Sequence, residues 1–446
     1  MKQSIYCLIL TMFFNCLSFA QTEDKKTCGT SKIMEEALKN PEKQQILDQL
    51  EIFTQEFINN SNNRMVAGGN YIIPVVVHVI HDYGDSNISY DQIDNGINRI
   101  NEDFQGINDD IDDVIDAFIE IIGFPNIEFR LATKDPDGNC TYGVTRTASS
   151  LTNYAVTNQI MNLVNWDDQK YLNIYVVKSF TDNMSSAAAY AALPGTGDDE
   201  YGDYIFCRDD YFGDWNTNND NGPTGNNWSR HTMSHEMGHF FNLRHPWGPS
   251  NDPGQAENCS IGDGVEDTPP TIGTDGNSVG CPLDQATCDG SLDNVQNIMD
   301  YSSCAHMFTQ GQANRMLAAA NSLAGKRWYL WQEDNLFNTG TDDETFSDDP
   351  YADCSPIPDF TSSTNVVCVG DEIDFVNFTY NYREVEISYA WTFEGGAPFT
   401  STAVNPTVTY DNPGSYDVTL TACRDGNCNT VTRENAITII SDMDIT

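Results

Sequence analysis

The stretch HTMSHEMGHFFNLRHPWG, residues 231–248, constrains the fold of this chain more than any other feature. On a helix, His235 and His239 are four positions apart, so both imidazoles project from one face and can share one Zn²⁺. Asn242 can end that helix, because Asn tolerates the left-handed conformation better than most residues. The sequence therefore predicts a short helix and a sharp turn that brings His245 to the same metal.

Three imidazole nitrogens leave the fourth zinc position open for water, as in a catalytic site. Zinc lowers the pKa of bound water from about 15.7 toward about 7, and Glu236 lies where it can take that proton. The alternative is an ordinary helix that carries several histidines, but a further histidine at this spacing favours the metal site. His231, one turn before His235, could approach the same metal, although three ligands already suffice.

The N-terminus predicts export. Residues 1–20 have a basic start at Lys2, a short apolar run, and small residues at Ser18 and Ala20, which is typical of a cleaved signal peptide. Residues 21–64 are polar and helix-prone, and they end in a flexible stretch around Arg64. We interpret them as a propeptide and its cleavage region, and we expect the protein to be secreted.

The charge balance excludes some partners. Lys+Arg 22 against Asp+Glu 66 gives a net charge of −44. Nucleic acids and anionic membranes require a basic surface, so we expect neither as a partner. Most of these carboxylates belong to a solvated surface, and some suit calcium.

The pattern of elements divides the chain. Residues 71–82 read as a buried strand, and residues 89–106 as an amphipathic helix with Ser89 as its N-cap. Further strands at 127–132 and 171–177 and a helix at 309–323 complete a predicted catalytic domain over residues 65–340. An acidic, turn-rich linker follows at 341–356. Short alternating strands over residues 357–446 predict a β-sandwich.

Five segments together resemble the pappalysin family of metzincins, in its cytophagalysin-like branch. They are TCGTSKIMEE, IPVVVHVIH, HEMGHFFNLRHPWG, GDGVEDTPP and MDYSSCAHMFTQGQANRM, and the resemblance spans nearly all of residues 28–337. It implies an α+β zincin: a twisted sheet and an active-site helix above, an irregular subdomain below, and the cleft between them. It also implies that residues 186–192 form the sheet edge that pairs with an extended substrate.

The resemblance implies further site residues. Met299 would form the apolar floor of a Met-turn, and Tyr301 would donate a hydrogen bond to the oxyanion. Asn242 departs from the glycine of the metzincin pattern, which leaves the form of that turn open. Ser302–Cys304 replace the acidic group of relatives that prefer basic residues, so we do not expect that preference.

The cysteines suggest latency. Of 13 cysteines, two precede residue 20, and 13 − 2 leaves an odd eleven in an oxidising compartment. The resemblance implies that Cys28 caps the zinc in the latent enzyme, and the alternative is that Cys28 pairs with another cysteine. The resemblance also implies bridges between the remaining ten, although connectivity does not follow from sequence: Cys259–Cys288, Cys281–Cys304, Cys354–Cys368, Cys423–Cys428 and, by remainder, Cys140–Cys207.

The loop NCSIGDGVEDTPP, with Asp263 and Thr268, resembles a calcium site of the family, and the alternative is a solvated acidic loop. The motifs YAWTFEGG and YDNPGSYDVTLTAC resemble a PKD domain, an Ig-like sandwich that serves as an accessory or as a plain spacer.

We therefore expect a secreted, monomeric zinc endopeptidase, made as a zymogen, in which Glu236 activates a zinc-bound water against protein or peptide substrates. The alternatives are an adhesion or binding protein with a non-catalytic metal site, and a zinc hydrolase of another bond. The intact Glu236 argues against the first, because a structural metal site needs no base.

Overall fold

The computed structural model describes residues 27–60, 71–181, 184–214, 230–274, 280–343, 354–383 and 386–441. These residues fall into two compact units, one within Asp24–Pro350 and one within Tyr351–Thr446, and each is described by itself. The predicted signal peptide, the region around Arg64 and most of the predicted linker lie outside the described residues.

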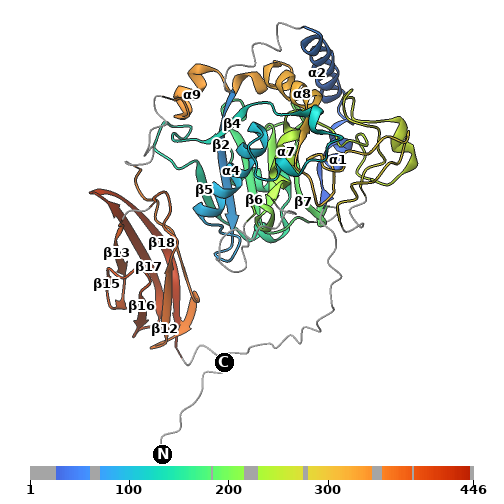
Figure 1. The fold of residues 1–446 in the computed structure, drawn as a ribbon. Helices are drawn as coiled ribbons and strands as arrows, with labels where there is room; N and C mark the ends of the chain where they lie inside the picture. The colour runs from blue at the N-terminus through green and yellow to red at the C-terminus, as the bar shows by residue number, and fades with distance from the viewer. Residues whose placement is uncertain are drawn as a thin grey trace, which may run out of the picture. The chain divides into compact units, whose positions relative to one another are not determined.

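A seven-stranded twisted sheet forms the centre of the first unit (Figure 1). Its order is β1 (Thr27–Cys28), β7 (Ala187–Ala191), β8 (Tyr204–Arg208), β6 (Leu172–Val177), β2 (Tyr71–His81) and β4 (Ile127–Leu131), with β5 (Val144–Ala148) also paired to β2. Strands β8, β6, β2, β4 and β5 pair in parallel, whereas β7 runs antiparallel to β8. The predicted strands at 71–82, 127–132 and 171–177 are confirmed.

The sheet packs against helices that bury its apolar face. Helix α4 (Tyr90–Gln105) begins where the sequence predicts, because the Ser89 hydroxyl accepts a hydrogen bond from Gln92 N at 3.1 Å. Its residues Ile93, Ile97, Ile100 and Phe104 are buried in the main core together with α7 (Thr232–Phe240). Helix α7 contacts α4, β7 and β8, so the sheet fixes its position.

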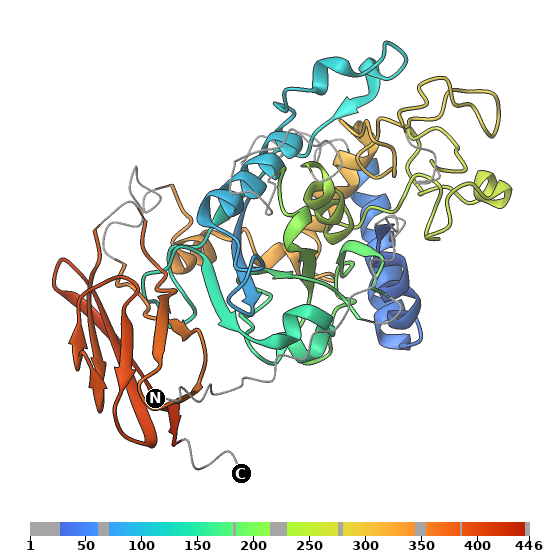
Figure 2. The same ribbon diagram turned by 90° about the horizontal axis from the view of Figure 1, so that it is seen from below.

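Several shorter elements complete this unit. Helix α8 (Gln310–Asn321) starts with a capping box at Thr309 and Gln312, and the predicted helix at 309–323 is confirmed. Helices α1 (Thr30–Ala37) and α2 (Pro41–Asn59) lie in the predicted propeptide, and in both ribbon views they lie close to the loops of residues 241–307 (Figure 2). The other elements are η1 (Ile111–Asp113), η2 (Ile119–Ile121), β3 (Ile122–Gly123), η3 (Ser150–Tyr154), α5 (Thr157–Met161), η5 (Asp209–Tyr211), η6 (Ala256–Ser260), β9 (Phe308–Thr309), η7 (Arg327–Tyr329) and α9 (Glu333–Thr339).

The segment between α7 and β9 is the irregular part that the sequence predicts, with only the short η6 among its described residues. Two disulfides, Cys259–Cys288 and Cys281–Cys304, cross-link it as the resemblance implied. Such bridges replace the apolar core that a loop-rich segment lacks.

Two other implied bridges are wrong. Cys207 carries a free thiol buried in β8, so it is not bonded to Cys140. Cys140 and Cys354 are each disulfide-bonded, but Cys368 is not the partner of Cys354. The odd count of cysteines therefore did not identify Cys28 as the single unbridged thiol, because Cys207 also keeps its thiol inside the sheet.

The second unit is a β-sandwich of two sheets. One has the order β10 (Phe360–Ser362), β12 (Glu372–Asn377), β16 (Thr407–Tyr410), β14 (Gly396–Ala397). The other has the order β11 (Val366–Cys368), β18 (Asn427–Ile440), β17 (Gly414–Arg424), β13 (Ser388–Phe393), β15 (Thr400–Ser401). Trp391 and Phe393 are buried in a core that belongs to this unit, and the disulfide Cys423–Cys428 joins β17 to β18.

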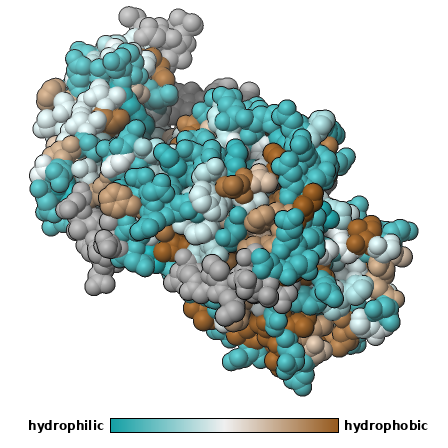
Figure 3. Space-filling model, turned by 90° about the horizontal axis from the view of Figure 1, so that it is seen from above, coloured by the Kyte–Doolittle hydropathy of each residue, from teal (hydrophilic) through white to brown (hydrophobic). Residues whose placement is uncertain are grey.

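The face of the molecule drawn in Figure 3 is mostly hydrophilic, as a net charge of −44 leads one to expect. Among the described residues, no helix combines the length and the apolar character that crossing a membrane requires.

Candidate active site

The three predicted zinc ligands converge. His235 and His239 project from one face of α7, and their Nε2 atoms are 3.1 Å apart. The chain turns after the helix and brings His245 Nε2 to 3.3 Å from His239 Nε2. All three imidazoles are buried, and together with Cys28 their ligand atoms lie within 4.8 Å of one another.

Backbone carbonyls fix the orientation of each ring. The Nδ1 atoms of His235, His239 and His245 lie 2.8, 2.8 and 3.3 Å from the carbonyl oxygens of Ile298, Leu243 and Ser250. Because a carbonyl only accepts, each Nδ1 carries the proton and each Nε2 presents a lone pair. Burial lowers the pKa of His235 to about 4, which keeps that ring neutral.

Two bare lone pairs 3.1 Å apart repel each other unless a cation lies between them. The donor set therefore fits Zn²⁺, for which neutral imidazoles are common ligands. Burial and the neighbouring imidazoles also hold the pKa values of His239 and His245 well below the usual range.

The turn that delivers His245 is made by Asn242. Its φ is 73°, the left-handed conformation, and Leu243 N donates to the carbonyl of Gly238 at 2.8 Å. Asn242 therefore takes the conformation for which the family pattern has glycine. Met299 lies beneath the helix, and a Cβ at Gly238 would stand 2.4 Å from the Met299 sulfur.

The carboxylate of Glu236 is buried beside the histidines and faces the predicted propeptide. Its Oε2 lies 3.6 Å from Cys28 Sγ and accepts a hydrogen bond from Thr30 Oγ1 at 3.0 Å. Burial raises the pKa of Glu236 to about 8, and the contacts from Cys28 and Thr30 lower it in part. A base in such a site holds a proton readily, as general acid–base chemistry near neutral pH requires.

Strand β1 carries Cys28 into the site. It pairs in parallel with β7, with Cys28 opposite Ala189, and Gly29 N donates to the Ala189 carbonyl at 2.8 Å. The outer edge of β7, where the sequence predicts substrate pairing, is thus covered by residues 27–29. Burial and the charge of Glu236 raise the pKa of the Cys28 thiol well above its usual value.

Tyr301 reaches the same site from the loop after Met299. Its hydroxyl lies 3.2 Å from His245 Nε2 and 2.5 Å from Asn251 Oδ1. Burial raises its pKa, and the charges of Cys28 and Glu236 raise it further, so the hydroxyl keeps its proton and can donate it in a hydrogen bond.

The predicted calcium ligands are also buried. Asp263 Oδ1 accepts from Val265 N at 2.9 Å, whereas Asp263 Oδ2 and Thr268 Oγ1 form no well-aligned hydrogen bond among the described residues, although the two side chains are in contact. Burial raises the pKa of Asp263 to about 7. Oxygen atoms that are buried and unpartnered are what a hard cation such as Ca²⁺ binds.

The remaining histidines have other partners. His231 points away from the three ligands and contacts Asp103 and Asp110, so the possibility that it joins their metal is wrong. His306 contacts Asp110. His78 is structural, because it is held between Thr145 and Asn173, and burial lowers its pKa to about 4.

Sequence reasoning missed two residues of the site. Thr30 contacts Glu236 and also accepts a hydrogen bond from Ala191 N at 2.9 Å. Trp247 stacks on the His245 ring, with centroids 4.5 Å apart and planes 8° from parallel. Both residues lie in motifs that carry the family resemblance, and only their nearness in sequence to Cys28 and His245 could have indicated that they belong to the site.

Comparisons with known proteins agree with this geometry. The model of the peptidase family M43, described as pregnancy-associated plasma protein-A, matches residues 155–321, and a PKD domain model matches residues 354–439. Extracellular metalloproteases of Arthroderma otae and Podospora anserina are 38% identical over 101 residues and 32% identical over 151 residues. These alignments cover 22% and 33% of this chain and 34% and 46% of the relatives, so the chain spans less than half of their length.

Solved structures match over a longer range. A glutamate-to-alanine mutant of promirolysin from Tannerella forsythia is 30% identical, covering 69% of this chain and 97% of that one, with a TM-score of 0.57. Mature mirolysin of the same organism, in complex with a cleaved peptide, is 32% identical, covering 61% of this chain and 99% of that one, with a TM-score of 0.52. The chain therefore belongs to the pappalysin family of metzincin metalloproteases, with a metzincin catalytic domain followed by an all-β PKD domain.

Proposed function

We propose that this protein is a secreted zinc endopeptidase that is made as a zymogen. The observation that carries the proposal is the convergence of three neutral Nε2 atoms beside a buried carboxylate. Zn²⁺ held there would supply the electrophile that polarises the peptide carbonyl and acidifies water. The relatives named above support an extracellular peptidase.

In this proposal each residue of the site has a separate role in the reaction. Glu236 accepts a proton from the attacking water and then delivers it to the nitrogen of the leaving amine, so that the carboxylate is regenerated. Tyr301 donates a hydrogen bond to the oxygen that becomes negative as the carbonyl carbon turns tetrahedral. Carbonyls at Ile298, Leu243 and Ser250 keep the imidazoles oriented throughout.

The free edge of β7 would position the substrate. After residues 27–29 leave, the backbone groups of Ala187–Ala191 are available to an extended peptide. Because this pairing uses backbone groups, it accepts many sequences and holds the scissile carbonyl near Glu236.

Latency in this proposal rests on two contacts. Cys28 would take the fourth zinc position as a thiolate and exclude water, since thiolates are strong zinc ligands. The Thr30 hydroxyl donates a hydrogen bond to Glu236 Oε2, so this oxygen is not free to accept a proton from water.

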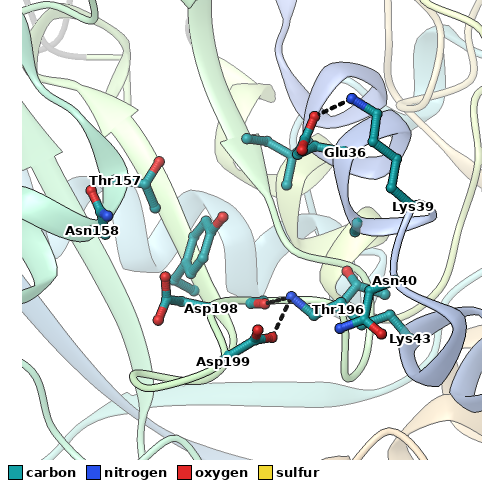
Figure 4. Close-up of a pocket in the computed structure, with 13 residues that line it drawn as sticks. Glu36, Lys39, Asn40, Lys43, Thr157, Asn158, Thr196, Asp198 and Asp199 are labelled. Atoms are coloured by element: carbon teal, nitrogen blue, oxygen red, sulfur yellow. Dashed lines mark hydrogen bonds and ion pairs between the residues drawn. The ribbon is translucent and has the colours of Figure 1, made fainter.

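The rest of the propeptide is anchored by polar contacts. Lys43 Nζ donates to the Gly197 carbonyl at 2.6 Å and pairs with Asp199 at 2.8 Å. A cavity of about 510 Å³ lies between these segments, with Glu36 and Thr157 on its walls (Figure 4). Glu51 of α2 pairs with Arg315 of α8 at 2.6 Å. Apolar contacts add to these, because Phe57 of α2 lies in the main core and Ile33 of α1 packs against a second apolar cluster.

Calcium would support the loop-rich segment. We assign Asp263 and Thr268 as ligands, because their oxygens are buried and close together without a well-aligned hydrogen bond. The ion would hold together residues 263–268 of the loop that follows η6.

The test is the substitution Glu236→Ala in the processed protein. Casein or gelatin cleavage should fall by about a thousandfold or more, as expected when a general base acting with a metal is removed. Zinc content and the circular dichroism spectrum should match those of the parent. Digestion by the variant at the parent's rate would overturn the mechanism.

A further inference from the structure

A second group of metal-binding side chains lies behind the active-site helix. The ligand atoms of Asp110, His231 and His306 are all within 4.8 Å of one another, and all three residues are buried. Asp110 immediately precedes η1, His231 is the N-cap residue of α7, and His306 precedes β9. Three segments distant in the sequence thus meet at one point.

The spacing of these atoms resembles that of the catalytic set. His231 Nε2 and His306 Nδ1 each lie 3.0 Å from Asp110 Oδ2. The Nε2 atoms around the catalytic position are 3.1 and 3.3 Å apart. Ligands at roughly 2.0–2.2 Å from one tetrahedral Zn²⁺ are separated by about 3.3 Å. Both sets therefore have the spacing of ligands that share one small cation.

An outer layer orients these ligands. His231 Nδ1 lies 2.8 Å from Asp103 Oδ2, which also accepts from Ser234 Oγ at 2.5 Å. A carboxylate behind a histidine is a common arrangement in metal sites, because it fixes the tautomer and raises the basicity of the ring. Asp103 therefore leaves His231 Nε2 to face Asp110.

One polar atom at the cluster lacks a partner. Asn108 Nδ2 donates to Asp110 Oδ1 at 2.7 Å and to the His306 carbonyl at 3.0 Å. Its Oδ1 is buried, and no group among the described residues donates to it. A buried amide oxygen without a donor is unusual, and a cation would satisfy it.

The charges around the cluster leave room for a cation. Arg230 pairs with Asp109 at 2.5 Å, and Arg99 pairs with Glu102 at 2.6 Å. Arg230 also lies 3.9 Å from Asp110 Oδ1, whereas Asp110 Oδ2 and the carboxylate of Asp103 face the two imidazoles. A divalent cation on these imidazoles would offset the negative charge that the arginines leave on this side of the cluster.

We propose that Asp110, His231 and His306 bind a second divalent transition metal, Zn²⁺, apart from the catalytic position. Asn108 Oδ1 supplies a fourth ligand, and Asp103 positions His231. Two imidazoles, a carboxylate and an amide oxygen form a ligand set that Zn²⁺ accepts. The ion ties the start of α7 and the segment that follows the Met-turn to the loop between α4 and η1, so it is structural rather than catalytic.

Metal counting on the full-length zymogen tests this proposal. The protein is equilibrated with Zn²⁺, dialysed and analysed for bound zinc. We expect two zinc ions per chain in the parent, one in H239N/H245N, and none when D110N is added to that pair. D109N is the matched control, since this neighbouring carboxylate is mostly exposed, and it should leave the zinc count unchanged.

Cobalt gives a second readout that does not depend on activity. In the H239N/H245N background, Co²⁺ should give visible d–d absorption that D110N abolishes and D109N retains. If D110N does not fold, as judged by circular dichroism, H306Q takes its place with the same expected losses.

One zinc per parent chain, with no loss in D110N or H306Q, would overturn the proposal and leave the cluster as a proton-held network. Failure of the proposed function is separate, because only the H239N/H245N pair removes the catalytic ligands.

Discussion

At the scale of single residues, Cys28 and Thr30 do different things to the active site. The thiol lies with the three imidazoles, whereas the hydroxyl contacts the carboxylate of Glu236. Removing either one should weaken latency, and removing the thiol should weaken it more, because a metal–thiolate bond is stronger than a hydrogen bond between an alcohol and a carboxylate.

We expect C28A to raise hydrolysis of a quenched fluorescent peptide by the unprocessed zymogen. The rise should be about tenfold or more, which corresponds to ~1.4 kcal/mol or more of lost blockage, and T30V should give a smaller rise. Gel electrophoresis must show that the propeptide is intact during the measurement. The exposed Lys39, which pairs with Glu36, offers K39A as the control. If the C28A zymogen hydrolyses the peptide no faster than the parent zymogen, Cys28 does not contribute to latency.

A second prediction at this scale concerns Asp209. Burial, together with the charge of Asp210, raises the pKa of its carboxyl to about 7. The folded protein therefore holds a proton that the unfolded chain releases above its ordinary pKa of about 4. Folding stability from this group falls as pH rises from about 4 to about 7, because the folded state binds more protons in that window.

The substitution D209N removes this effect. We expect the thermal midpoint of D209N to exceed that of the parent by a few degrees at pH 8, and the two midpoints to converge near pH 4. D112N is a suitable control, since this side chain is exposed. An unchanged difference across this pH range would show that Asp209 is ionised in the fold.

The candidate zinc ligands and base could be predicted from the sequence because all four lie within eleven consecutive residues, His235–His245. Helix geometry relates the first three, and the turn at Asn242 delivers His245. Asp110 and Thr30 could not be assigned in this way. They meet His231 and Glu236 across separations of 121 and 206 residues, and no local pattern records such contacts.

At the scale of elements, α7 and its turn set the geometry of the site. The helix has nine residues and ends one turn after His235, and Asn242 then reverses the chain. The carbonyl oxygen of Asn242 also accepts a hydrogen bond from Arg315 Nε at 2.8 Å, so this turn is linked to α8.

Substitutions at Asn242 distinguish the energetic cost of its backbone conformation from the contribution of its side-chain amide. N242A should lower the free energy of unfolding by about 1–2 kcal/mol, since alanine pays the full steric cost of the left-handed conformation. N242G should be as stable as the parent, because glycine adopts φ near 73° freely and removes an amide nitrogen that is buried without a partner in the described structure. Urea denaturation of the three proteins measures this. An equal loss of unfolding free energy in N242A and N242G would show that the side-chain amide, and not the backbone conformation, causes the loss.

Elements with a clear period were predictable, and short ones were not. The helix at Tyr90–Gln105 follows from Ser89 and four apolar residues on one face, and β2 follows from an unbroken β-branched run. Strand β1 has only two residues, so it has no period to detect, and its pairing with β7 is a contact across about 160 residues of sequence. The bridges at Cys140 and Cys354 were missed for a related reason, because connectivity depends on the fold.

At the scale of the whole molecule, the two units have separate cores. The strong acidic excess agrees with the hydrophilic face in Figure 3, and it predicts repulsion from other polyanions. Composition gave this property directly. The position of the candidate active site does not follow from composition, because it depends on where α7, the segment around Met299 and residues 27–30 meet.

The most direct test of the central claim is X-ray absorption at the zinc edge, recorded on the full-length zymogen and on the propeptide-free protein. The structure predicts nitrogen scatterers at about 2.0–2.1 Å in both samples and one sulfur at about 2.3 Å in the zymogen alone, replaced by oxygen after processing. A second zinc at Asp110 would add nitrogen and oxygen but no sulfur. A zymogen without bound zinc, or one whose spectrum lacks the sulfur and matches that of the processed protein, would contradict the account.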